Sequence, residues 1–237
     1  MGMFDFLLSE EKKIKKNQRR LVNRDAQPED RELSAKWLAD CGSPNSLLAL
    51  LSRFDMTLDH QLKNQGEIEY VYSLAAYQGE AIVESLQAWL RMCRRVGTPL
   101  RLYQDLAGHE AAVQMVYELL EKELARQDFK ALKKKKLLVW LAEVRHEGAI
   151  ASAAPFLEDF DEGVRYAAAE VIITQDDEAG RVPLLRALAN PEEESNRVKV
   201  RVTEVFASRR WPVEDVEGVA EQLPEGYAVR DGRIVSG

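Results

Sequence analysis

The feature that most constrains the fold of this chain is a repeated pattern of helix, polar turn and helix near its C-terminal end. The segment PFLEDF at residues 155–160 aligns with PLLRAL at residues 183–188, at an offset of 28 residues. The next helical segments align residues 164–171 with residues 198–205, at an offset of 34 residues, so the second turn is six residues longer. A helix pair of this size cannot bury its apolar face alone. Neighbouring pairs are therefore expected to stack and share a continuous core.

The rest of the chain also has a helical period. Apolar residues recur at helical spacing in residues 47–54 and 113–124. Turn signals rich in glycine and proline, such as those at residues 42–44 and 97–99, separate short segments. The alternation that is typical of strands is almost absent before Gly226. These patterns predict an all-α protein.

Residues 155–171 resemble a unit of the HEAT-repeat family, especially the short bacterial units also seen in phycobilin lyases. The residues that carry the resemblance are Pro155, Leu157, Asp159, Asp161, Val164, Arg165 and Ala168. The resemblance implies an α-solenoid of stacked antiparallel helix pairs. In this family, a turn aspartate and an arginine of the second helix typically form a ladder of pairs between adjacent units. The resemblance therefore implies that Asp161 and Arg165 are a structural pair, and we prefer this role for Arg165 to ligand binding.

The sequence predicts three parts: a basic amphipathic segment at residues 1–27, a HEAT-like solenoid at residues 28–212, and a C-terminal helix with a β-hairpin cap at residues 213–237. The hairpin is predicted by residues that alternate around Asp231 and Gly232, a favoured two-residue turn. Because a lone hairpin is only marginally stable, we expect it to pack against the final helices.

The N-terminal segment places an apolar tip before a cationic run. The tip contains Phe4, Phe6, Leu7 and Leu8, and the cations are Lys12, Lys13, Lys15, Lys16, Arg19, Arg20 and Arg24. Such a segment could make peripheral contact with an anionic membrane or enter a groove of a partner. The alternative is a helix that packs Ile14 and the apolar tip onto the first helix pair and leaves its cations in water. We favour the second interpretation slightly, because acidic residues dilute the cationic run.

A second basic segment forms a candidate partner-binding surface. It consists of Lys130, Lys133, Lys134, Lys135 and Lys136 at the start of one helix, together with Lys199 and Arg201 on later second helices. In a HEAT-like solenoid these second helices line the concave face, so the face would be basic and would bind a protein with an acidic surface. The turn edge, with residues 159–162 and 192–194, would be acidic. The simpler interpretation of the lysine run is a solvated helix start.

The sequence offers no signature of catalysis. It contains no phosphate-binding loop, dinucleotide motif, nucleophile elbow or zinc-protease helix. The three histidines, and the cysteines Cys41 and Cys93, lack metal-ligand spacing. We therefore expect no catalytic residue, no metal ligand and no cofactor. The two unpaired cysteines also favour a reducing, cytoplasmic location.

The composition of the chain limits the classes of molecule that it could bind. The chain has 237 residues and a formal net charge of -7, which disfavours nucleic acid as a partner. No apolar run approaches the roughly 18 residues of a transmembrane helix. The leading hypothesis is a non-catalytic protein-protein interaction scaffold or adaptor. An alternative is a DNA-binding protein of the HEAT-like DNA glycosylase type, with Asp159 or Asp161 as its acid and with Trp89, Trp140, Tyr166 and Trp211 as its aromatic residues. A weaker alternative is a lyase or chaperone of a tetrapyrrole-bearing protein.

Overall fold

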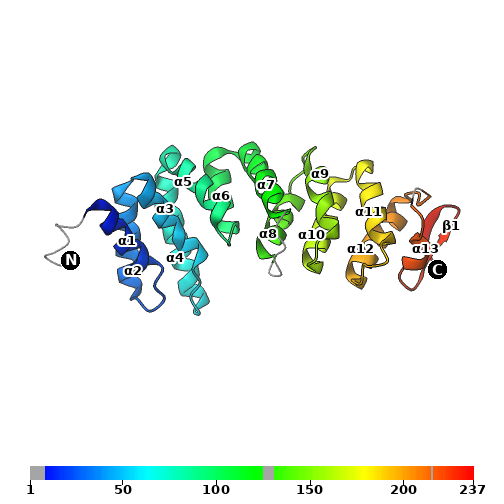
Figure 1. The fold of residues 1–237 in the computed structure, drawn as a ribbon, viewed down its shortest axis with the longest axis horizontal. Helices are drawn as coiled ribbons and strands as arrows, with labels where there is room; N and C mark the ends of the chain where they lie inside the picture. Colours follow the sequence, from blue (N-terminus) through cyan, green and yellow to red (C-terminus); the bar gives the residue numbers. More distant parts are fainter. Residues whose placement is uncertain (1–8, 125–130, 215) are drawn as a thin grey trace. The chain divides into compact units, whose positions relative to one another are not determined.

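The computed structural model describes residues 9–124, 131–214 and 216–237 (Figure 1). The described chain is mostly helical and ends in a two-stranded antiparallel hairpin, which confirms the predicted all-α class. It divides into two compact units, residues 1–115 and residues 116–237, which are considered separately. The boundary falls inside the segment 28–212 that the sequence predicts as one domain. Among the helices of the described ranges, none combines the length and the apolar character that crossing a bilayer requires.

The N-terminal unit consists of two layers of helices. Helices α1, α3 and α5 contact one another in sequence order, and α2, α4 and α6 form a second row beside them. Leucines such as Leu38, Leu50 and Leu86 are fully buried between the layers. The elements of this unit are α1 (Glu10–Leu21), α2 (Pro28–Cys41), α3 (Pro44–Leu51), η2 (Ser52–Asp55), α4 (Gln61–Tyr77), η3 (Gly79–Ile82), α5 (Val83–Met92), α6 (Gly97–Ala107) and the first turns of α7 (His109–Leu124).

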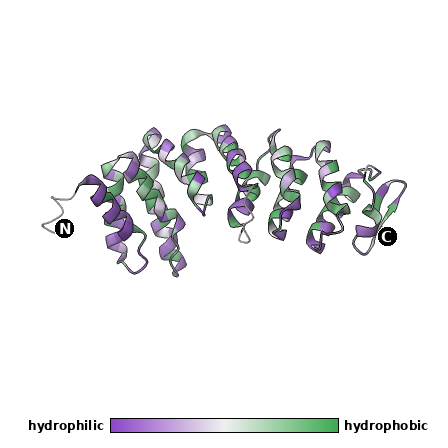
Figure 2. Cartoon of the chain, viewed as in Figure 1, coloured by the Kyte–Doolittle hydropathy of each residue, from purple (hydrophilic) through white to green (hydrophobic). Residues whose placement is uncertain are grey.

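The cationic helix α1 belongs to this N-terminal unit. It packs against α2 and α3 and buries Ile14 and Leu21 there. Its remaining surface is largely hydrophilic (Figure 2). This packing agrees with the interpretation in which the helix docks on the first helix pair. The predicted apolar tip, which contains Phe4, Phe6, Leu7 and Leu8, lies outside the described residues.

The C-terminal unit also has two rows of helices. Helices α8, α10 and α12 contact one another in order, and η4 contacts α11 in the other row. The core between them is rich in alanine and β-branched residues, including Val164, Ala168 and Ile172. The elements after α7 are α8 (Leu132–Ala142), α9 (Ala149–Ala153), η4 (Ala154–Glu158), α10 (Glu162–Gln175), η5 (Glu178–Gly180), α11 (Arg181–Ala189), α12 (Asn196–Arg209), α13 (Val219–Gln222), β1 (Tyr227–Arg230) and β2 (Arg233–Ser236).

Helices α10 and α12 begin and end at equivalent positions. Both contain 14 residues, and their N-caps, Asp161 and Ser195, each accept a hydrogen bond from the backbone N–H three residues later. Both helices end on a left-handed residue, Asp176 with φ 55° and Arg210 with φ 52°. Each of these positions in α10 lies 34 residues before its equivalent in α12, which is the offset that the sequence alignment predicts.

The hairpin forms at its predicted turn. Asp231 and Gly232 have φ values of 49° and 66°, as a two-residue turn with two positive φ angles requires. Tyr227 pairs with Ser236 and Arg230 with Arg233. Strand β2 packs against α12 and buries Ile234. The hairpin thus covers part of the last long helix, as its marginal stability in isolation predicts.

Candidate functional site

The lysine run of the predicted basic face is partly buried. Four consecutive residues point around most of a helix, so two of the lysines of α8 are directed inward. Lys134 Nζ lies 2.8 Å from Asp159 Oδ2, and the Lys134 side chain is 4% exposed. Lys133 Nζ lies 3.9 Å from Glu123 Oε1, and both side chains are buried. Lys135 and Lys136 are exposed, whereas Lys130 lies outside the described residues.

The predicted cations of α12 are matched by polar groups of neighbouring elements. Arg201 forms a bidentate contact with Glu170 on α10: Nε donates to Oε1 over 2.5 Å, and Nη2 donates to Oε2 over 3.1 Å. Lys199 Nζ donates a hydrogen bond to Gln222 Oε1 over 2.9 Å. Part of the predicted basic face is therefore engaged in contacts within the unit, whereas Lys135 and Lys136 remain exposed. At Lys133, Lys134 and Arg201 the positive charge is balanced by carboxylates of the same unit.

Arg165 has a structural role, but its carboxylate partner differs from the predicted one. Its Nε and Nη2 each donate to a different carboxylate oxygen of Glu193 over 2.7 Å, and Nη1 donates to the carbonyl oxygens of Asp159 and Phe160. Asp161 instead caps α10 by accepting from the Val164 N–H over 3.0 Å. The carboxylate of Asp161 is therefore directed to the helix start, and Arg165 reaches forward to the turn before α12.

Three such forward links recur along the second row of the C-terminal unit. Lys134 on α8 contacts Asp159 before α10, Arg165 on α10 contacts Glu193 before α12, and Lys199 on α12 contacts Gln222 on α13. We call these three contacts the forward ladder. Its first two carboxylates are largely buried, and each pairs with a cation, the buried Lys134 or the partly buried Arg165. The ladder ties each helix to the segment that follows.

The N-terminal unit contains a related link that the sequence analysis missed. Arg31 is the fourth residue after the N-cap Gln27, as Arg165 is after Asp161. Its Nη2 donates to Glu67 Oε1 over 2.6 Å, and its Nη1 donates to turn carbonyls, including that of Asn23 at 3.3 Å. Aligning the two helices by their starts reveals the equivalence of Arg31 and Arg165.

Glu67 on α4 binds a second buried arginine. Arg53 Nε donates to Glu67 Oε2 over 3.1 Å, and the Arg53 side chain is 0% exposed. The remaining donors of Arg53 reach Met56 O and Asn64 Oδ1. Burial by itself raises the pKa of Glu67, but hydrogen bonds from Arg31 and the charge of Arg53 outweigh it and lower that pKa. Glu67 is therefore ionised at neutral pH and links two arginines.

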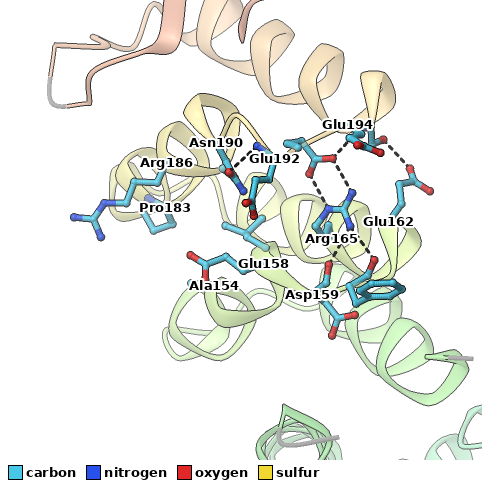
Figure 3. A pocket seen from close by; sticks show the side chains of 15 residues that line it. Ala154, Glu158, Asp159, Glu162, Arg165, Pro183, Arg186, Asn190, Glu192 and Glu194 are labelled. Atoms are coloured by element: carbon cyan, nitrogen blue, oxygen red, sulfur yellow. Dashed lines mark hydrogen bonds and ion pairs between the residues drawn. The ribbon is translucent and has the colours of Figure 1, made fainter. Parts of the chain in front are cut away.

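A groove of about 1180 Å³ opens in the C-terminal unit between η4, α11 and the loop at residues 190–195. Figure 3 shows Arg165 and its bonds at one side, with Glu158 and Arg186 at the other. Apolar atoms of Ala154, Leu157 and Pro183 contribute to its lining. The polar lining consists of six carboxylates, two arginines, an asparagine and a serine: Glu158, Asp159, Glu162, Glu192, Glu193, Glu194, Arg165, Arg186, Asn190 and Ser195.

The forward ladder accounts for only some of these carboxylates. Asp159 and Glu193 are ladder members, and Glu162 Oε1 accepts a hydrogen bond from Ser195 Oγ over 3.1 Å. The other three carboxylates are exposed and take no part in the ladder: Glu158, Glu192 and Glu194. We call these the rim acids. Helices η4 and α11 end at the groove and helices α10 and α12 begin there, so the partial charges of the helix ends oppose one another.

An aromatic side chain stands beside the rim acids. Phe160, in the turn between η4 and α10, lines the groove and is 78% exposed. The groove therefore combines an apolar lining, an aromatic edge and surplus negative charge. This combination suits a side chain with an aliphatic stem and a cationic head.

Three of the six residues nominated for DNA chemistry have other contacts or are buried. Asp159 is bound to Lys134, Asp161 caps α10, and Trp89 is buried in the N-terminal unit. In the described ranges, no group of three or more histidine, cysteine, aspartate or glutamate residues is arranged to hold a metal ion. No protein-family model matches the sequence, and no curated protein matches it.

Proposed function

We propose that this protein is a non-catalytic interaction module of the HEAT-like solenoid type, whose acidic groove binds a cationic segment of a partner protein. The two rows of helices in each unit support the solenoid proposal. The rim acids carry the binding proposal, because they are exposed around an apolar lining although the forward ladder does not use them.

The chemistry of the groove supports a cationic partner. The three rim acids line one groove and carry the same charge, so a cation bound there is attracted by all of them. A lysine or arginine can lay its aliphatic stem on Leu157 and Pro183 and direct its charge to the rim acids. The groove therefore favours a cationic partner. The lysine run predicts an acidic partner instead, but two of its four consecutive lysines, Lys133 and Lys134, are buried.

The experiment is a fluorescence anisotropy titration of the full chain with two labelled peptides. One peptide places arginines and leucines among serines, and the other replaces each arginine by glutamate. We expect binding of the arginine peptide only, and at least a tenfold loss of affinity in the double variant Glu192→Gln, Glu194→Gln. The matched control is Glu143→Gln, Glu178→Gln, which removes the same charge at exposed positions outside the groove lining.

Two results would contradict the proposal. The first is equal affinity for both peptides, since the rim acids discriminate by charge. The second is equal loss of affinity in the groove variant and in the control, because net charge rather than the groove would then set the binding. Repeating the titration at about 50 mM and about 500 mM salt separates exposed charge pairs, which salt screens, from apolar contacts.

A further inference from the structure

The exposed side of α8 combines apolar and cationic side chains. Leu132 and Val139 are 48% and 42% exposed, although α8 packs against α10 on its other side. They lie seven residues apart, so two turns of helix, or about 10 Å, separate them along one line. Lys135 and Lys136 are exposed between them, one on each side of this line. We call these four residues the α8 face.

The two lysines of the α8 face differ from their neighbours in the lysine run. Lys133 and Lys134 are buried, and each has a carboxylate partner. In the part of the chain that the structure describes, the side chains of Lys135 and Lys136 form no ion pair and no hydrogen bond. Their ammonium groups are therefore available to a carboxylate of another molecule.

Lys135 extends from α8 to the first turn of α10. A Cβ atom at Gly163 would lie 2.9 Å from Lys135 Nζ, so the missing side chain leaves the space that the ammonium group occupies. Asp161 Oδ1 borders the same space, but this atom accepts the capping hydrogen bond from the Val164 N–H. The cationic part of the α8 face therefore reaches from α8 to the start of α10.

We propose that the α8 face binds an acidic amphipathic helix of a partner protein. None of the four residues of the α8 face lines the acidic groove, so this inference goes beyond the proposed function. An amphipathic helix presents apolar residues at spacings of three, four and seven, which matches the distance from Leu132 to Val139. Carboxylates that flank those apolar residues then meet Lys135 and Lys136.

Glu143 gives the bound helix a direction. It is exposed and lies four residues after Val139, on the same side of α8. A carboxylate of the partner beside Glu143 is repelled, whereas a carboxylate beside Lys135 or Lys136 is attracted. The acids of the partner are therefore expected next to the start of α8, with neutral or cationic residues next to its end.

The charge and size of the α8 face favour this occupant over a nucleic acid or an anionic membrane. A chain with a net charge of -7 is repelled as a whole by a polyanion. A helix that binds a membrane surface carries many cations on one face and a large apolar face that includes aromatic residues. The α8 face has two cations and two aliphatic side chains. An acidic helix uses both kinds of contact over a short distance.

The test is a fluorescence anisotropy titration of the full chain with a labelled, alanine-based helical peptide. This acidic helix peptide carries leucines at helical spacing and glutamates beside the first of them. The glutamate peptide of the groove experiment does not present such a face, because its serines favour helix less than alanine does. We expect the acidic helix peptide to bind at about 50 mM salt and to bind more weakly at about 500 mM.

Two pairs of variants test the two kinds of contact, with circular dichroism to verify folding. Neutralising the lysines in Lys135→Gln, Lys136→Gln should weaken binding about tenfold at about 50 mM salt, and the control Lys63→Gln, Arg230→Gln should leave it unchanged. Removing the apolar side chains in Leu132→Gln, Val139→Gln should weaken binding at both salt concentrations. Its control replaces two exposed leucines of the N-terminal unit: Leu33→Gln, Leu62→Gln.

Reversing the charge tests the pairing directly. Both proteins in this comparison carry Glu192→Gln, Glu194→Gln, so that a cationic peptide does not bind at the acidic groove. One of them also carries Lys135→Glu, Lys136→Glu. We expect the protein with its lysines intact to bind the acidic helix peptide, and the reversed protein to bind only a peptide in which each glutamate is replaced by lysine. A reversed protein that still prefers the acidic helix peptide overturns the proposal.

Failure of this inference can be told apart from failure of the proposed function, because the two surfaces share no residue. If the arginine peptide binds through Glu192 and Glu194 but the acidic helix peptide does not bind, only the inference is overturned. Unchanged affinity in Lys135→Gln, Lys136→Gln also overturns it. A short DNA duplex, or vesicles of phosphatidylcholine and phosphatidylserine, that bind through these lysines more tightly than the acidic helix peptide would overturn the protein helix as occupant.

Discussion

Arg165 and Glu193 are joined by two parallel hydrogen bonds of 2.7 Å each, from Nε to Oε2 and from Nη2 to Oε1. The Glu193 side chain is 2% exposed, so its charge depends on this partner. The pair connects α10 to the loop before α12, and both residues line the acidic groove. The same contact thus stabilises the C-terminal unit and holds one wall of its candidate binding site.

Replacing Arg165 with alanine should destabilise the C-terminal unit by about 2–4 kcal/mol, because Glu193 would remain buried without its cation. Chemical denaturation measures this loss. Arg186→Ala is the control, since Arg186 is an exposed arginine of the same groove and its loss should change stability by less than about 0.5 kcal/mol. Equal losses of stability in the two variants would contradict the structural role assigned to Arg165.

Replacing Glu67 with glutamine should have an effect of similar or greater size in the N-terminal unit. Arg31 and Arg53 would keep their buried charges and lose their shared carboxylate, at a cost of about 3–5 kcal/mol. Glu69→Gln removes a glutamate of the same helix that pairs with Arg101 at 3.4 Å and is about half-exposed. Its loss should cost less than about 1 kcal/mol. A small effect at Glu67 in urea denaturation would contradict the buried triad.

Acid should destabilise the fold through three paired carboxylates. Burial raises the pKa of Glu67, Glu170 and Glu193, but hydrogen bonds and charges of their arginine partners outweigh it and lower all three pKa values below the ordinary 4.5. A carboxyl group with a lowered folded-state pKa contributes stability that is complete above the unfolded value. That contribution is lost as the pH falls through the folded value.

The free energy of unfolding should therefore be flat between about pH 6 and pH 7 with respect to these groups and should fall below about pH 4.5. Denaturation at a series of pH values measures this dependence. The slope below pH 4.5 should be shallower in Glu67→Gln, because that variant has one fewer group to protonate. A slope equal to that of the wild type would show that Glu67 does not titrate with a lowered pKa.

The last link of the forward ladder can be strengthened. Lys199 meets the neutral amide of Gln222 where the other two cations meet carboxylates. Gln222→Glu creates an ion pair at this position and should stabilise the unit by about 0.3–1 kcal/mol. Thermal denaturation at neutral pH provides the measurement. The control is Ala220→Glu, which adds an acid at an exposed neighbouring position. An equal gain in stability in this control would show that the change in net charge causes the effect.

The rim acids should strengthen binding of the arginine peptide and lower the stability of the free protein. Glu192 and Glu194 flank the buried Glu193, so the double variant Glu192→Gln, Glu194→Gln removes like charges from one short loop. We expect the melting temperature of the free protein to rise slightly, by an amount equivalent to about 0.5 kcal/mol, while the affinity for the arginine peptide falls. A fall in both quantities would indicate that these glutamates support the fold instead.

Much of the local structure could be predicted from the sequence. The 34-residue offset places the starts and ends of α10 and α12, and the Asp231-Gly232 turn places the hairpin. These features are set by caps and turn residues that act within a few positions along the chain. The burial of Ile14 likewise follows the helical spacing of the apolar residues in α1.

Contacts between distant segments could not be predicted in the same way. Which of four consecutive lysines points inward depends on how α8 packs against its neighbours, and Lys133 and Lys134 are the two that do. The partner of Arg165 lies 28 residues away, whereas Asp161 is nearby in sequence but is used as a helix cap. The triad of Arg31, Arg53 and Glu67 joins three elements with no local motif.

The most direct test of the central claim is to map the arginine peptide on the protein by NMR. We predict that backbone amide shifts change with peptide concentration in residues 157–162 and 186–195, which surround the groove. Those changes should be absent in the variant Glu192→Gln, Glu194→Gln. Shift changes confined to residues outside these two segments, or identical changes in that variant, would contradict the account.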